Sequence, residues 1–271
     1  MTDFLPLFDP LNQALIDFLK QLNEKDWQRA TVCKGWTVKD IVAHLLDTSI
    51  RRLSLGRDDY QHVQQEFATY EDLIAHINNL NKEWVAASKR LSPKILIELT
   101  SKYQDELIAY FKTLDPFDMA LFPVTWAGKS HSENWFDIAR EYSERWLHQQ
   151  QIRFAFNNQE ILDPKFYSPY LEIIMEALPY TYQKINAEIG KTVALEVVGP
   201  AGKRWTITKD KKFWIFDDEN KEADALIYID QQIAWLLFSK GIRAEEAGQF
   251  YQIHGERNLA LPVLNMLTIM A

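Results

Sequence analysis

Residues 140–153 read REYSERWLHQQQIR, and residues 35–47 read GWTVKDIVAHLLD. Glu144 and His148 in the first stretch are one helical turn apart, so on a helix they point from one face in the same direction. His44 in the second stretch adds an imidazole from another helix. Together these side chains would form a metal site with open coordination positions, which separate a metal that takes part in chemistry from one that only holds a fold together.

The composition predicts a globular protein. The chain has 271 residues, of which 47% are hydrophobic and 13% aromatic, enough for one large domain or two ordinary ones. A net charge of −8 argues against broad contact with nucleic acid or an anionic membrane. The single cysteine, Cys33, excludes an internal disulfide and a cysteine-rich zinc site. The N-terminal segment is typical of neither a signal peptide nor a membrane span, so we expect a cytoplasmic protein.

The first half of the sequence predicts an all-α four-helix bundle. Apolar residues recur at helical spacing in segments 12–22, 37–53, 70–91, 93–114 and 133–156. Thr37 and Asp40 form a capping-box pattern, and Ser92 precedes a first-turn proline at the fourth segment. Short connections between most of these segments favour antiparallel neighbours, while residues 115–132 form a longer connection.

The second half predicts an α+β domain. A helix over 166–185 is followed by short segments rich in β-branched and aromatic residues at 192–198, 204–208, 213–216 and 225–229. Helical spacing returns at 231–239, a last strand is expected at 251–254, and a closing helix at 256–270. We therefore expect two domains, 1–160 and 161–271, joined near residues 157–163.

Periodicity alone leaves the role of Glu144 and His148 open. The most apolar face of their helix carries Trp135, Ile138, Ala139, Tyr142 and Trp146. The candidate pair lies on the opposite side, together with Asp137, Glu141 and Gln151. That side is either a solvated stripe, which periodicity favours, or the wall of an inner cleft. His44 borders the apolar face of its own helix, where a buried, hydrogen-bonded histidine is the alternative to a ligand.

Two stretches resemble the mycothiol-dependent maleylpyruvate isomerase and DinB-like family. The stretch DWQRATVCKGWTVKDIVAHLLD (26–47) is similar to its N-terminal signature, and WAGKSHSENWFDIAREYSERWLHQQQIR (126–153) to its last bundle helix. The resemblance implies a DinB-like bundle in which His44, Glu144 and His148 are the metal ligands. Many relatives carry an acidic residue at the position of Gln151, which here could orient His148 only as a neutral hydrogen-bond acceptor.

The resemblance continues beyond the bundle. Residues from 193 onward, with Trp205 and the stretches 223–225, 241–243 and 255–257, are similar to the C-terminal domain of that isomerase, which is related to sterol-carrier-like folds. We therefore expect a C-terminal α+β domain of the maleylpyruvate isomerase type.

The donor set predicts the chemistry. Two imidazoles and one carboxylate suit Zn²⁺ best, with Ni²⁺, Fe²⁺ or Co²⁺ as alternatives. A low-molecular-weight thiol at an open position would lose its proton near neutral pH, and the thiolate could add to an activated double bond or another electrophile. The resemblance implies mycothiol, with the protein acting as a thiol-assisted isomerase or a transferase. The expected partners are this thiol and a small-molecule substrate, and a homodimer is compatible with the sequence.

Weaker catalytic candidates and other functions stay open. Arg243 and Arg257 could pair bidentately with a carboxylate, although surface arginines show the same pattern. Glu141, or Asp137, could serve as a general base in a metal-dependent hydrolase. A further alternative is a non-enzymatic protein that encloses a small hydrophobic ligand, since a fold does not determine a function.

Overall fold

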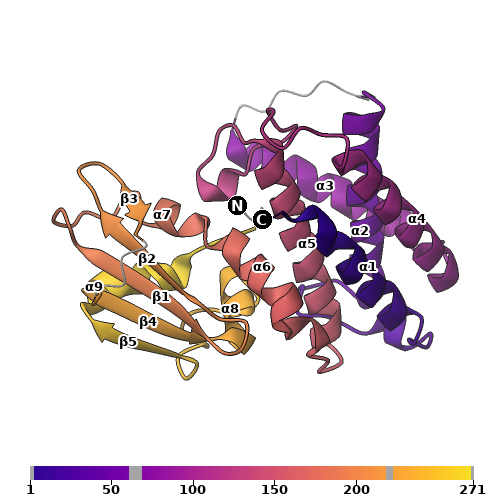
Figure 1. Ribbon diagram of the computed structural model, residues 1–271. Coiled ribbons are helices and arrows are strands. Elements are labelled where there is room, and N and C mark those ends of the chain that lie inside the picture. Colours follow the sequence, from indigo (N-terminus) through magenta and orange to yellow (C-terminus); the bar gives the residue numbers. More distant parts are fainter. Residues whose placement is uncertain (1–2, 61–68, 218–221, 270–271) are drawn as a thin grey trace. The chain divides into compact units, whose positions relative to one another are not determined.

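The computed structural model describes residues 3–60, 69–217 and 222–269, which form two compact units (Figure 1). The first unit contains residues up to Phe122 together with Glu133–Gln159. The second contains Pro123–Ser132 and the residues that follow Gln159. The predicted fold class, a helical half followed by an α+β half, is confirmed.

The first unit is built from helices. They are α1 (Leu5–Leu19), α2 (Val38–Arg52), α3 (Tyr70–Ser88), α4 (Pro93–Phe111) and α5 (Asn134–Phe154), with short helices η1 (Asp26–Gln28) and η2 (Leu53–Arg57). The predicted capping box starts α2: the Asp40 N–H donates to the Thr37 hydroxyl at 3.3 Å, and the Thr37 N–H donates to the Asp40 carboxylate at 2.9 Å.

The first helix starts earlier than its sequence predicts. The expected start at residue 12 was wrong, because α1 begins at Leu5 and accommodates both Pro6 and Pro10. Pro6 lies in the first turn, where no intrahelical N–H bond is needed, and Pro10 removes a single bond. Phe8 packs edge-on against the rings of Phe111 and Tyr142, at centroid distances of 5.9 and 5.6 Å, so tertiary contacts stabilise this turn.

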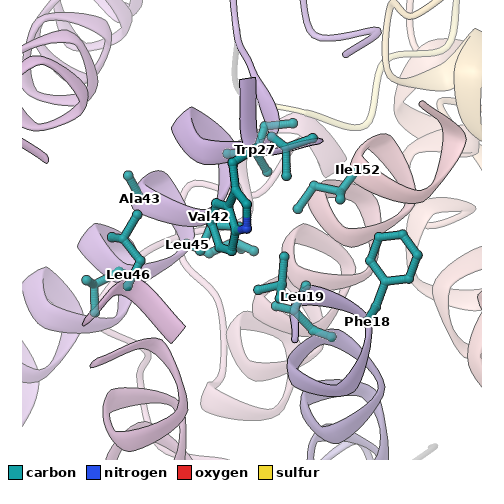
Figure 2. Close-up of a cluster of buried hydrophobic side chains, with 12 residues drawn as sticks. Phe18, Leu19, Trp27, Val42, Ala43, Leu45, Leu46 and Ile152 are labelled. Carbon is teal, nitrogen blue, oxygen red and sulfur yellow. The ribbon is translucent and has the colours of Figure 1, made fainter. Parts of the chain in front are cut away.

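A buried hydrophobic cluster joins α1, α2 and α5 (Figure 2). Leu19 of α1, Val42 of α2 and Ile152 of α5 are fully buried, and Trp27 of η1 lies among them. Burying each such side chain contributes roughly 1.5–3 kcal/mol. This cluster holds α2 beside α5, the two helices that carry the candidate ligands.

The second unit is a mixed sheet with helices. The described residues form a five-stranded sheet of order β3-β2-β1-β4-β5, with β1 and β4 parallel and the other neighbours antiparallel. The strands are β1 (Thr192–Val198), β2 (Arg204–Lys209), β3 (Trp214–Phe216), β4 (Ala225–Asp230) and β5 (Tyr251–Gly255). The helices are α6 (Pro164–Ile174), α7 (Ala177–Thr181), α8 (Gln231–Phe238) and α9 (Arg257–Ala260), followed by η5 (Leu261–Asn265). The strands predicted from the sequence are confirmed.

Prolines shorten two predicted helices. The helix expected over 166–185 is divided into α6 and α7, because Pro179 has no N–H to bond the Met175 carbonyl. The Leu178 N–H bonds that carbonyl instead, at 2.8 Å. The closing helix expected over 256–270 is likewise only α9 and η5, with Pro262 inside the latter.

Residues 123–132 lie in the second unit, although they precede α5 in the sequence. This segment contains η3 (Thr125–Ala127), which packs against α7. Gly128 follows with φ of +75°, and a Cβ there would come within 2.3 Å of the Tyr180 ring. Glycine is required for both the left-handed backbone and the close approach.

Candidate metal centre

Helices α2 and α5 bring the three predicted ligands together. The rings of His44 and His148 meet edge to face, with centroids 4.7 Å apart. Nε2 of His148 lies 3.6 Å from Oε2 of Glu144, the residue one turn earlier on α5. The two imidazoles therefore meet between α2 and α5, and the Glu144 carboxylate lies beside the His148 ring.

His44 is held as a neutral imidazole. Its side chain is buried, with 8% of its surface exposed, and its ring packs edge-on against Trp36 at 5.1 Å. Burial lowers the pKa of His44 well below its usual value, and the nearby His148 and Arg51 lower it further. Its Nδ1 makes no hydrogen bond of normal geometry among the described residues, although the side chain of Asn81 lies close enough to raise the His44 pKa slightly against these effects. Neutral imidazole is the form that binds metals.

Gln151 orients His148. The amide oxygen of Gln151 lies 2.8 Å from Nδ1 of His148. Since that oxygen is an acceptor, it can hold the ring proton of a neutral, metal-binding His148 on Nδ1, which would leave Nε2 for the ion. The neutral role expected of Gln151 is thus geometrically available.

Glu144 is held as a carboxylate. Burial acts to raise its pKa, but the hydrogen bond and charge of His148 and the cations Arg140 and Arg145 outweigh burial, so the pKa lies below its usual value. The site therefore presents two nitrogen donors and one anionic oxygen donor.

These residues fit a divalent cation by their chemistry. The donor types match those of Zn²⁺ sites, the buried Nδ1 of His44 makes no hydrogen bond of normal geometry within the described ranges, and His148 carries the supporting hydrogen bond usual for a ligand. Within the described ranges, no group of at least three His, Cys, Asp or Glu side chains is arranged so that it could already hold an ion. In this arrangement His148 contacts Glu144 instead.

Of the two alternatives for this side of α5, the solvated stripe that periodicity favoured was wrong, because most of the side is buried. Asp137 is 0% exposed, and Glu141 and Gln151 are also buried. Asp137 accepts hydrogen bonds from Arg52 of α2 and, at 2.9 Å, from Nη2 of Arg140. Buried arginines compensate these carboxylates, which single-helix periodicity cannot reveal.

Glu141 lies in the same network. Its carboxylate accepts from Arg140 at 3.2 Å and from Arg145 at 3.1 Å. Arg145 also donates to the hydroxyl of Ser49 on α2, at 2.9 Å. Sequence reasoning missed Arg145 and Ser49; the alternation of arginine and glutamate along 140–145 was the available signal.

Arg243 and Arg257 lie in the second unit. Arg243 is 76% exposed and pairs with Glu246 at 3.1 Å. Arg257 is exposed at the start of α9. Both show the features of ordinary surface arginines, and their catalytic role stays a prediction.

The fold and this centre define a class: proteins with a helical unit that carries a His/Glu/His cluster, followed by an α+β unit. The family "Mycothiol maleylpyruvate isomerase N-terminal domain" matches residues 8–153, so the chain belongs to this family.

Two solved structures share the fold of nearly the whole chain. A histidine-to-alanine mutant of the mycothiol-dependent maleylpyruvate isomerase is 12% identical, with a TM-score of 0.56, over 94% of this chain and 97% of that one. Another structure of the mycothiol-dependent maleylpyruvate isomerase is 13% identical, with a TM-score of 0.53, over 88% and 91%. No curated protein matches the chain significantly. None of the described helices is long and apolar enough to cross a membrane.

Proposed function

We propose that the protein is a metal-dependent isomerase that uses a low-molecular-weight thiol such as mycothiol. The observation that carries this proposal is the convergence of His44, Glu144 and His148 from α2 and α5. Membership of the isomerase family, and the fold shared with the mycothiol-dependent maleylpyruvate isomerase, support the thiol and the reaction type.

His44, Glu144 and His148 would hold the metal, with Zn²⁺ as the best match to the donors. When bound, the ion supplies a lowered pKa for a coordinated thiol, so that thiolate exists near neutral pH. Gln151 would hold the proton of the metal-bound His148 on Nδ1, so that Nε2 is the atom available to the ion. The burial of His44 keeps that imidazole neutral and excludes water from its ring.

Isomerisation by a thiolate has a simple balance of bonds. The sulfur adds to one carbon of an activated double bond, and the π electron pair moves onto the conjugated carbonyl. Rotation follows about the resulting single bond, and the pair then re-forms the double bond as the C–S bond breaks and the thiolate leaves. The substrate class is a small unsaturated acid of the maleylpyruvate type. Transfer of the sulfur to an electrophile would use the same thiolate but retain it in the product.

The test combines metal content with product analysis. Protein prepared without chelator or nickel affinity is incubated with Zn²⁺, and we expect about one ion per chain. His148→Ala should lose the ion and the thiol-dependent isomerisation of maleylpyruvate, whereas His131→Ala, at an exposed histidine, should lose neither.

Each component of the proposal has its own contradicting result. Isomerisation that continues without zinc would contradict metal dependence. Isomerisation without added thiol would contradict the thiol. A stable thioether product in place of the isomer would show that the protein is a transferase. Retention of metal by His148→Ala would show that the ligand assignment is wrong.

A further inference from the structure

A line of polar contacts runs between α2 and α5. It starts at the buried pair of Arg52 and Asp137, continues through Ser49 and Arg145, and ends where His44 meets His148. Residue numbers fall along α2 as they rise along α5, so the helices are antiparallel and the contacts follow one seam. Along this seam the hydrogen bond of Ser49 with Arg145 lies between the Arg52–Asp137 pair and the candidate metal centre.

Both partners in this contact are fixed. The Ser49 hydroxyl donates to the Leu45 carbonyl at 2.9 Å, which leaves its oxygen lone pairs to accept from Arg145. Nη2 of Arg145 donates both to Ser49 and, at 3.1 Å, to Glu141 on its own helix. Ser49 is 0% and Arg145 2% exposed, so water does not compete for these bonds.

The contact is adjacent in sequence to two of the candidate ligands, and the charge of Arg145 acts on both. Leu45, which accepts from Ser49, directly follows His44, while Arg145 directly follows Glu144. The charge of Arg145 acts on both of these ligands. A change in this link would therefore alter the spacing of α2 and α5 where two ligands must meet one ion.

We infer that Arg145 and Ser49 are positioning residues that set the separation of His44 from the Glu144–His148 pair and so the affinity and geometry of the metal centre. The inference rests on the proposed function. Neither residue is assigned as a ligand. Their role is to lock the two ligand-bearing helices in register, as supporting hydrogen bonds do in metal sites.

The experiment measures Co²⁺ binding by its visible absorption, which reports both affinity and coordination geometry without any assay of turnover. Ser49→Ala removes the acceptor, and Arg145→Lys keeps the charge but loses the forked guanidinium. Ser49→Thr retains the hydroxyl and serves as the conservative variant.

Ser54→Ala is the matched control. The Ser54 hydroxyl makes the same type of bond to its own chain, to the Ile50 carbonyl at 2.9 Å, and the described residues show it no hydrogen bond to α5. Thermal unfolding of each apoprotein separates a loss of stability from a loss of positioning.

We expect Ser49→Ala and Arg145→Lys to weaken Co²⁺ binding on the order of tenfold or more and to shift the absorption bands. Ser49→Thr should restore most of the affinity, and Ser54→Ala should match the wild type. Wild-type affinity and spectrum in both Ser49→Ala and Arg145→Lys, or equal losses in Ser54→Ala, would overturn the inference. If the wild type itself binds neither Co²⁺ nor Zn²⁺, the metal part of the proposed function fails, and this inference with it.

Discussion

Asp137→Asn should strongly destabilise the helical unit. One oxygen of Asp137 accepts from Arg52 and the other from Nε and Nη2 of Arg140, at 3.1 and 2.9 Å. The asparagine amide must replace one of these oxygens with an NH₂ group, so a donor would face a guanidinium donor. Arg52 has no other hydrogen-bond acceptor among the described residues, whereas Arg140 retains Glu141.

The magnitude follows from burial. Asp137 is 0% and the Arg52 side chain 4% exposed, so the substitution leaves a cation uncompensated away from water. Removing one partner of a buried ion pair costs about 3–5 kcal/mol. That is a large part of the 5–15 kcal/mol by which folded proteins are typically stable.

The assay is urea unfolding at pH 7, followed by far-UV circular dichroism because the first unit is helical. Asp58→Asn is the control, since Asp58 pairs with Arg57 at the surface, where ion pairs contribute little. The double variant Arg52→Met/Asp137→Asn should recover much of the loss, because the uncompensated cation is gone. If Asp137→Asn unfolds at the same urea concentration as Asp58→Asn, the argument from burial is refuted.

Three further predictions concern local interactions. Gln151→Ala should lower Zn²⁺ affinity about 10- to 100-fold in a chelator competition, because His148 loses the hydrogen bond that orients it. Gln151→Glu should preserve the affinity. Equal affinities of the alanine variant and the wild type would contradict this prediction. Thr37→Ala should cost about 0.5–2 kcal/mol of unfolding free energy through loss of the α2 cap, and an unchanged urea midpoint would refute it. The hydrogen bond from Lys191 lowers the pKa of Asp224 to about 2. Between about pH 4 and pH 2 the unfolded state therefore binds more protons than the folded state. The stabilisation by the Lys191–Asp224 pair is lost as the pH falls through that range. Asp224→Asn should therefore reduce the free energy of unfolding at pH 7 by less than about 1 kcal/mol, since the carboxylate is partly exposed. The substitution should have less effect at pH 2. An equal effect at both pH values would exclude the ion pair as the cause.

Local sequence determined most secondary structure. Helical spacing and the Thr37 cap predicted α2, and the alternation of β-branched residues with turn residues predicted the strands, since these signals act within a few residues. Proline effects were less predictable. The early turns of α1 depend on the packing of Phe8. Pro179 lies within α7, where it interrupts helical hydrogen bonding between α6 and α7 although the apolar spacing is continuous.

Placement of residues 123–132 and of the charged side of α5 depended on tertiary structure. Nothing local indicated that Gly128 packs under Tyr180 in the second unit. Asp137 and Glu141 have the spacing of a solvated stripe, and only the arginines of α2 and α5 explain their burial. The sequence of one helix does not show which neighbouring helix will bury its charged side. The cations that compensate its buried carboxylates can lie on that neighbour.

The candidate centre shows the same division. The sequence by itself determined that Glu144 and His148 share a face of α5, because helical geometry places residues one turn apart side by side. Only the tertiary structure decided that His44 meets them, because the packing of α2 against α5 brings together residues about a hundred positions apart. Burial in that packed pair also keeps His44 neutral, since removing an imidazole from water disfavours its charged form.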